Sequence, residues 1–408
     1  MDEEICEGYQ LSPQQERLWR LLRRGGDYRW QYAVSLEGAL HVPTLSGALR
    51  RLVARHEILR TGFQSSEGAE AAFQVINEKG GVHLREHDLG GMPRAEQQAE
   101  VERLWREGLS RDFAYEQGMV LHAGLLRLAP ESHLLVLCAP ALCADAWTMR
   151  QMVSELARHY VESCEGRPGE WPEVLQYADY AAWLNELPES EADAAEGLAH
   201  WQAAAEVAPV KLPLEREAGG AAEGEGRGEV FAHGETVGEE LAARVERFAR
   251  EAGVETADVL LAAWAALLWR LTGERDVSVE VCSDGRNYDY LRPALGCFAQ
   301  YLPVHFRLGG GHSFASILKL VGEAKAVAEE WQGYYGSEAR RRRDGAAPSG
   351  VVGFDYRERG RALSAGGLRV SEWRLEGRGE RLKLRLRAEG GGERGGLAVR
   401  VECDARLY

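Results

Sequence analysis

The chain has 408 residues, of which 45% are hydrophobic, and its formal net charge is −15. This length predicts two or three domains or two fused lobes, and the apolar content excludes a disordered chain. The acidic balance argues against nucleic acid or an anionic membrane surface as a partner. The start, Met1–Glu4, is acidic where a secretory signal would be basic, so we expect a cytoplasmic protein.

Two further features of the composition limit the possible functions. The longest apolar run, 259–269, is about half the length needed to cross a bilayer. The seven cysteines form no Cys-x-x-Cys pair and have no histidine nearby at metal-ligand spacing. We therefore expect reduced thiols and no metal site.

The first half of the chain alternates helical and strand patterns. In chain order we predict a helix over 14–24 with Ser12 as its cap and Pro13 in its first turn, a strand over 30–36, a helix from Pro43, strands over 119–126 and 133–139, and a helix over 147–160. The strand over 133–139 is nearly all apolar, which is typical of a central strand that is covered on both faces.

The second half repeats this order of patterns. We predict an amphipathic helix ending at Gly253, a buried helix over 257–271 and a strand over 277–281. Residues 382–386 alternate apolar and cationic side chains, and 397–401 should pair with them across a glycine-rich turn.

Three segments predict exposed chain. The stretch 188–196 is acidic, and 212–228 is rich in Gly, Glu and Ala, as in a linker. The basic cluster Arg340–Arg343 is interpreted first as a solvated loop or helix end. It is also the local patch that we would expect to contact an acidic partner.

Four motifs then follow one another in an order found in one enzyme family. They are LSPQQERLW at 11–19, RHEILRTGF at 55–63, YADYAAW at 177–183, and GRN at 285–287 followed by LGCFAQYLPV at 295–304. This series resembles the first, second, fourth and fifth motifs of the condensation domains of nonribosomal peptide synthetases. The resemblance covers essentially the whole chain.

The resemblance implies an α/β fold of the α+β sandwich type, with two chloramphenicol-acetyltransferase-like lobes in a V-shaped pseudo-dimer. We expect the N-terminal lobe over 1–172 and the C-terminal lobe over 173–408, with the family's last helix missing after Tyr408. In the family, carrier proteins deliver phosphopantetheine-linked substrates into a tunnel between the lobes. The implied partners are thus carrier proteins and neighbouring synthetase domains, and no cofactor is bound directly.

The third motif of the family, His-His-x-x-x-Asp-Gly, is degenerate in this chain. The two histidine positions hold Pro140 and Ala141, and Ala146 replaces the glycine, whereas Asp145 remains. Neither replacement can accept a proton, although the second histidine is the family's catalytic residue. The resemblance also implies a structural ion pair between Asp145 and Arg60.

Other residues of the former site are Trp147, which is retained, and Arg286, Gln300 and His305 in the fifth motif, where Gln300 and His305 depart from the family pattern. His305 is a candidate replacement base from the other lobe. His56 and Cys143 are interpreted as structural residues, a packed histidine and an inert thiol.

Three functions remain open. The first is a non-catalytic platform that binds a carrier protein or a trans-acting tailoring enzyme such as an oxygenase or hydroxylase. The second is an atypical acyltransferase that works by positioning its substrates without the histidine. The third, heterocyclisation, ranks lowest because it needs a second aspartate where Pro140 stands.

Overall fold

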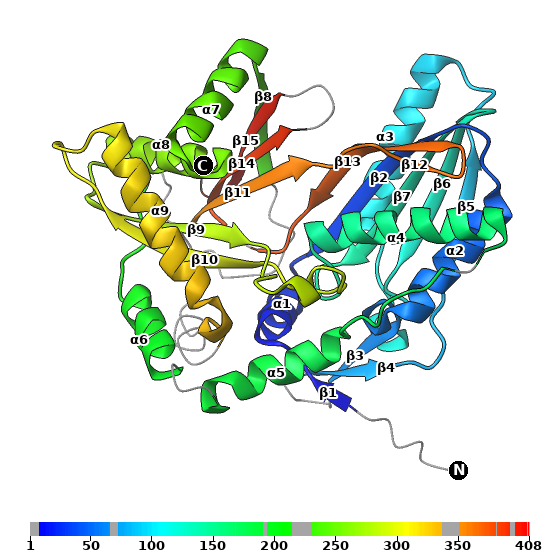
Figure 1. Ribbon diagram of the computed structural model, residues 1–408, viewed down its shortest axis with the longest axis horizontal. Helices are drawn as coiled ribbons and strands as arrows, with labels where there is room; N and C mark the ends of the chain where they lie inside the picture. The colour runs from blue at the N-terminus through cyan, green and yellow to red at the C-terminus, as the bar shows by residue number, and fades with distance from the viewer. Residues whose placement is uncertain are drawn as a thin grey trace.

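The computed structural model describes residues 8–65, 72–167, 169–190, 194–213, 230–336, 351–380, 382–391, 396–405 and 407. It consists of two lobes, each built on a six-stranded mixed sheet, with α1 and α5 at their junction (Figure 1). The predicted α/β class with two lobes is thereby confirmed. The predicted cluster at Arg340–Arg343 and most of the linker at 212–228 lie outside the described residues.

The first sheet forms the core of the N-terminal lobe. Its strands, in spatial order, are β12 (Leu363–Ala365), β13 (Leu368–Gly377), β2 (Arg29–Glu37), β7 (Ser132–Pro140), β6 (His122–Ala129) and β5 (Leu84–Asp88). Only the β5–β6 pair is parallel among these strands. The apolar strand β7 is central, as its sequence predicts. Both faces of this sheet are covered by helices, because β7 carries apolar side chains on both.

Helices α2 (Val42–Arg55) and α4 (Ala146–Glu165) cover one face, and α3 (Arg94–Ser110) covers the other. A separate three-stranded antiparallel sheet, β1 (Gly8–Gln10), β4 (Ala72–Ile76) and β3 (Thr61–Ser65), lies beside this lobe. Short 3-10 helices occupy Glu57–Arg60 (η1) and Tyr115–Gln117 (η2). Helix α1 (Pro13–Arg23) begins at the predicted cap, where Ser12 and Gln15 form a capping box.

The second sheet has the order β10 (Gln300–Arg307), β9 (Asp276–Ser283), β11 (Val352–Arg359), β14 (Leu384–Gly391), β15 (Leu397–Asp404) and β8 (Val230–Val237). The predicted antiparallel pairing of the last two segments is confirmed in β14 and β15. Helices α7 (Glu239–Ala252), α8 (Thr256–Thr272) and α9 (Phe314–Glu330) lie over its apolar face. The remaining elements are α5 (Tyr177–Ser190), α6 (Ala194–Ala205), η3 (Asp289–Leu291) and η4 (Gln332–Tyr334).

One connection crosses between the lobes. After β11 the chain leaves the second sheet, adds β12 and β13 to the first sheet next to β2, and then returns as β14. Figure 1 shows β13 running back from the N-terminal lobe toward the junction. The predicted division at residues 172 and 173 does not include this crossover, which gives the N-terminal lobe two strands from the second half of the chain.

No single helix in the described parts of the chain is long and apolar enough to cross a membrane. Helices α7 and α8 satisfy the length and composition criteria only when taken together, and they meet at an angle of 104°.

Candidate functional site at the lobe junction

The degenerate motif lies where β7 ends and α4 begins. Pro140 is the last residue of β7 and stands opposite Arg29 of β2, and the amide of Ala141 donates to the carbonyl of Tyr28 at 3.0 Å. The chain then turns, with the amide of Cys143 bonded to the carbonyl of Pro140 at 2.9 Å. Asp145 caps α4 by accepting the amide of Thr148 at 2.7 Å. A strand end and a helix N-terminus therefore fix this segment from both sides.

The two former histidine positions, Pro140 and Ala141, are closed to solvent and carry no acid–base group. Ala141 is 1% exposed, and Pro140 is also buried. Cys143 is fully buried, and burial, with Cys297 beside it, raises the pKa of its thiol well above the usual value. The thiol therefore stays protonated at neutral pH, in agreement with its interpretation as structural. The backbone geometry of the motif is retained without its chemistry.

Asp145 pairs with Arg286, and the predicted pair with Arg60 is wrong. Arg286 Nη1 donates to Asp145 Oδ2 at 2.9 Å and Nη2 donates to Oδ1 at 3.3 Å. Arg60 instead donates to the carbonyl of Asn77 and, at 3.2 Å, to Glu57 Oε1. The physical reason is that Arg60 ends the 3-10 helix η1, beside the chain that leaves β4.

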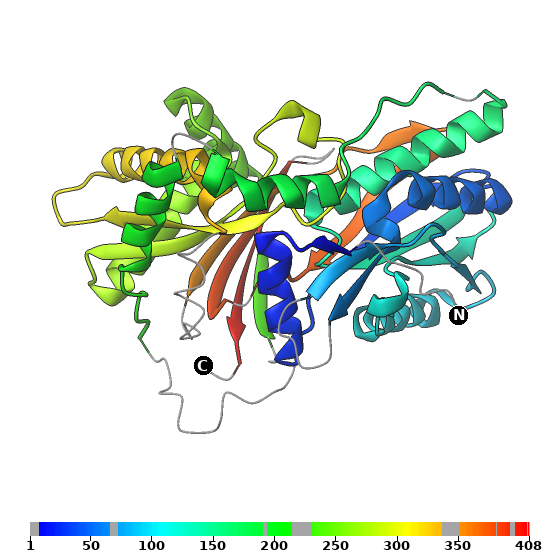
Figure 2. The same cartoon turned by 90° about the horizontal axis from the view of Figure 1, so that it is seen from below.

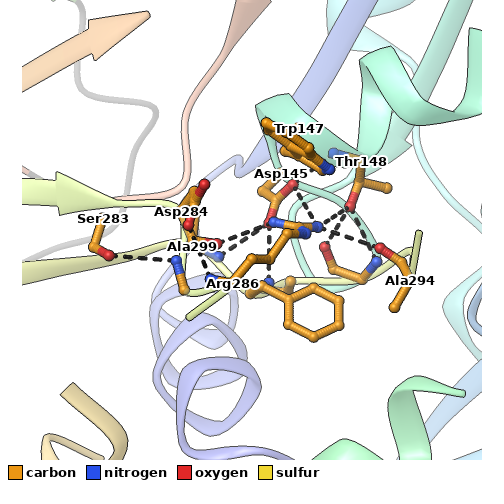
Figure 3. Close-up of polar contacts among 12 residues, drawn as sticks. Asp145, Trp147, Thr148, Ser283, Asp284, Arg286, Ala294 and Ala299 are labelled. Carbon is orange, nitrogen blue, oxygen red and sulfur yellow. Dashed lines mark hydrogen bonds and ion pairs between the residues drawn. The ribbon is translucent and has the colours of Figure 1, made fainter. Parts of the chain in front are cut away.

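The carboxylate of Asp145 also accepts backbone amides from the other lobe. The amides of Phe298 and Ala299 donate to Oδ2, each at 3.0 Å (Figure 3). Thr148 Oγ1 donates to the carbonyl of Gly296 at 2.8 Å. We call Asp145, Thr148, Arg286 and the backbone of residues 296–299 the inter-lobe clasp. Because every lone pair of this buried carboxylate faces a donor, the clasp stabilises the charge without water.

The motif segments converge on this clasp. Tyr177, which opens α5, donates its hydroxyl to the carbonyl of Cys297 at 2.7 Å and contacts the hydroxyl of Ser12 at 2.8 Å. A Cβ at Gly296, where φ is +157°, would lie 2.0 Å from the Tyr177 ring, so this position requires glycine. The first, third, fourth and fifth motifs are thus joined by direct hydrogen bonds.

The predicted site residues do not all gather here. Trp147 Nε1 donates to the carbonyl of Arg292 at 3.0 Å, against the loop that carries the clasp. Gln300 opens β10 next to the clasp, where its Nε2 donates to the carbonyl of Gln332 at 3.2 Å. His305 lies five residues after Gln300 along β10, which corresponds to about 16 Å at the usual rise per residue. Its Nε2 lies 3.5 Å from Asp276 Oδ1. His305 is therefore wrongly predicted as a replacement base for Ala141.

A buried hydrogen bond between His56 and Glu155 supports the interpretation of His56 as a structural residue. Its Nε2 lies 2.7 Å from Glu155 Oε2, which links the end of α2 to α4. Burial raises the pKa of Glu155, but the hydrogen bond and charge of His56 outweigh it, and the net pKa is lowered. The carboxylate thus stays ionised, and His56 serves as its packing partner.

The sequence interpretation missed a row of charged residues on the second sheet. Residues Asp355, Arg357, Arg385, Arg387 and Glu402 are all at most 8% exposed and face the N-terminal lobe. The one signal for them was the alternation of apolar and cationic residues along 382–386. No group of three or more His, Cys, Asp or Glu side chains in the described residues could hold a metal ion.

His122 predicts a pH dependence of stability. His122 lies on β6 opposite Cys138 of β7, and its ring stacks on the Phe113 ring with centroids 4.8 Å apart. Burial, followed by the charge of Arg111, lowers the pKa of His122 to about 4. Between the unfolded pKa of about 6.5 and pH 4 the unfolded chain binds more protons. The free energy of unfolding should therefore fall as pH drops through this window, by about 1–2 kcal/mol after solvent screening of this partly exposed ring.

Urea unfolding at pH 7 and pH 4.5 checks this expectation. His122→Phe, which keeps a ring against Phe113, should lose that part of the pH dependence, while His83→Gln at an exposed position should retain it. An unchanged pH dependence in His122→Phe would contradict the assignment.

Comparison with known proteins identifies the family. A family model of the condensation domain matches residues 6–338. The chain is 31% identical over 332 residues to the isonitrile lipopeptide synthase of Mycobacterium tuberculosis (strain ATCC 25618 / H37Rv), covering 79% of this chain and 13% of that protein.

Solved structures are similar at lower identity. The condensation domain of the monacolin K polyketide synthase MokA superposes with a TM-score of 0.83 at 21% identity, covering 98% of this chain and 93% of the other. The X-domain in its complex with OxyB from teicoplanin biosynthesis superposes with a TM-score of 0.77 at 23% identity, covering 98% of this chain and 89% of the other. The chain spans between 4% and 14% of the lengths of eight curated relatives that it matches in sequence.

Proposed function

Because this chain belongs to the condensation-domain family of nonribosomal peptide synthetases, we propose that it is a member that no longer forms amide bonds and serves as a docking platform. It binds a carrier protein and, with it, a trans-acting tailoring enzyme. The observation that supports this proposal is the contrast within one motif: Asp145 holds a fully bonded inter-lobe clasp, while Pro140 and Ala141 replace both histidines.

The contrast favours a retained scaffold. The clasp, Tyr177 and Gly296 join four motif segments that are far apart in the chain, and each needs a specific side chain or a glycine. Removing a general base lowers a rate by about 10²–10⁴-fold and has no necessary effect on folding. A domain that keeps the residues that hold its fold together and lacks the general base is suited to binding.

The structural likeness to the X-domain suggests the kind of partner. That domain is found in a complex with OxyB. At 23% identity the likeness extends to the fold, so an oxygenase partner of this chain is part of the proposal. The substrates are then phosphopantetheine-linked groups that remain on their carrier while the partner enzyme modifies them.

The alternative is an active acyltransferase that works by positioning. Correct placement of two reactants can account for several kcal/mol of an activation barrier. In its favour is the retention of Arg286 and Trp147 at the lobe junction. Against it, Pro140 and Ala141 carry no acid–base group at the two former histidine positions.

Binding to a carrier protein is the direct test. Each carrier protein encoded by the genes neighbouring this one is titrated, in loaded and unloaded form, into the labelled domain at low and high salt. The stand-alone oxygenases or hydroxylases encoded by the same group of genes are tested in parallel. We expect weak binding through a small interface, under about 1,200 Å², that tightens with the loaded carrier. The absence of binding at high micromolar concentration to every carrier and enzyme would overturn the platform proposal.

A further inference from the structure

The second sheet has one face that is charged and yet buried. Its apolar face packs under α8 and α9, whereas alternate residues of β11, β14 and β15 place charged side chains on the opposite face. That face meets the N-terminal lobe: Arg387 Nη2 donates to the carbonyl of Gly377 in β13 at 3.0 Å, and the Arg357 guanidinium lies 5.2 Å from the Trp30 ring centroid. Figures 1 and 2 show α1 at this same junction.

Two carboxylates serve most of the guanidinium groups here. Asp355 Oδ2 accepts from Arg357 Nη2 and from Arg387 Nε, each at 3.2 Å. Glu402 accepts from Arg385 Nε at 2.9 Å and from Arg387 Nη1 at 3.1 Å. Arg385 Nη1 also donates to the hydroxyl of Tyr301 at 3.1 Å. Arg385 and Arg387 are therefore well bonded.

Arg357 is different, because most of its donors have no acceptor. The residue is 6% exposed, yet its Nε and Nη1 have no hydrogen-bond partner among the described residues. Nearby, Arg378 follows the end of β13, and only its backbone amide makes a hydrogen bond within the described structure, to the carbonyl of Arg29. A buried guanidinium with free donors is costly, because its desolvation is not compensated.

The local charge has a positive excess. We call Arg357, Arg378, Arg385 and Arg387 the arginine cluster; two carboxylates, Asp355 and Glu402, lie among them. Further along the same face, the buried residues Glu280, Asp404 and Lys383 add one net negative charge, so the excess that remains comes from Arg378, which is partly exposed.

The pKa shifts within the cluster are divided. Burial lowers the pKa of Arg357 and of Arg385, but Asp355 and Glu389 outweigh it for Arg357, and Tyr301 and Glu402 outweigh it for Arg385, so both net pKa values are raised. Burial, with Arg357 and Arg385 beside it, lowers the pKa of Arg387 to about 10. Burial and Arg385 likewise lower the pKa of Arg378. Burial alone would raise the pKa of Asp355, but Arg357 and Arg387 hold it at about 2. Both carboxylates are thus already ionised, and within the cluster four guanidinium groups share them.

We propose that the arginine cluster is a binding site for an anionic oxygen group, a carboxylate or a phosphate, held at the lobe junction by one of the free donors of Arg357 and by Arg378. Nε and Nη1 of Arg357 lie on different edges of the guanidinium plane, so one of them donates a charge-assisted hydrogen bond to the group. The Trp30 ring stands opposite Ala139, one residue before Pro140, so the bound group lies beside the former catalytic segment. The site is independent of whether the domain docks a partner.

Isothermal titration calorimetry with inorganic phosphate and, separately, with malonate tests the proposal at constant ionic strength balanced with chloride. We expect binding of at least one of the two anions and a higher melting temperature in its presence. Arg357→Met should weaken that binding by about tenfold or more, because it removes a charge-assisted hydrogen bond together with a buried positive charge. Asp355 keeps Arg387 as a partner in this variant, so we expect it to fold.

Matched variants keep the result interpretable. Arg359→Gln alters the next arginine on the same face of β11, which is 48% exposed and lies 3.8 Å from Glu389, and it should bind the anion normally. Arg378→Gln, at a partly exposed position, provides a second test if Arg357→Met fails to fold. Binding of phosphate alone would indicate a phosphate ligand, and binding of malonate alone a carboxylate. The proposal would be overturned if neither anion bound at tens of millimolar, or if wild type, Arg357→Met and Arg378→Gln bound the anion equally.

Discussion

Replacing Asp145 with alanine is expected to lower the free energy of unfolding by about 3–5 kcal/mol. The change leaves the buried Arg286 guanidinium, whose side chain is 1% exposed, without its carboxylate, and it removes the acceptor for the amides of Phe298 and Ala299. It also removes the side-chain cap of α4, which by itself is worth about 1 kcal/mol. Urea unfolding, followed by circular dichroism, measures the effect.

Two further variants separate these contributions. Asp145→Asn retains a capping side chain and loses the charge, so the loss that it still shows belongs to the clasp. Arg60→Ala, at the residue that the sequence paired with Asp145, removes bonds to Asn77 and Glu57 only and should cost less, about 1–2 kcal/mol. The assignment would be contradicted if Asp145→Ala unfolded at the same urea concentration as wild type, or if Arg60→Ala lowered the free energy of unfolding more than Asp145→Ala. The inter-lobe clasp would then not provide the stabilisation assigned to it.

The wild-type domain should form no amide bond above background. In a single-turnover assay, two carrier proteins loaded with aminoacyl groups are mixed with the domain, and intact mass spectrometry detects the dipeptidyl carrier. A lost general base corresponds to a rate about 10²–10⁴-fold lower, which places the reaction near that of the carriers alone. Dipeptide formation clearly above the sample without domain would favour the positioning mechanism.

Ala141→His tests whether the missing imidazole is the only defect. Ala141 is 1% exposed within the main core, so a larger side chain there should cost about 1–3 kcal/mol of stability. We expect the variant to remain inactive because this position is closed. Activity of Ala141→His alone would show that both substrates still reach the former site. His305→Ala serves as the control at a distant histidine and should change neither activity nor stability appreciably.

Local patterns predicted the elements of the site well. The apolar run at 133–139, the cap at Ser12 and the alternation before the glycine-rich turn correspond to β7, α1 and β14 with β15. Each depends on side-chain periodicity or on a bond within four residues, which a single sequence contains.

Contacts across long stretches of chain were not predictable in the same way. Asp145 and Arg286 are 141 positions apart, and the choice between Arg286 and Arg60 depends on how the β9–β10 loop folds over α4. The same holds for β13, which follows β11 of the second sheet along the chain but pairs with β2 of the first. The free donors of Arg357 depend on which groups the opposing lobe brings to it.

The passage of β12 and β13 into the first sheet means that neither lobe is an autonomous folding unit. A fragment that ends at residue 172 would leave β2 as an open edge strand, with the main-chain donors and acceptors that β13 satisfies facing solvent. Such an edge invites pairing with other chains and aggregation. A breakpoint for exchanging segments between related synthetases therefore belongs outside the whole stretch from β1 to β15, since a cut between the lobes would divide a shared sheet.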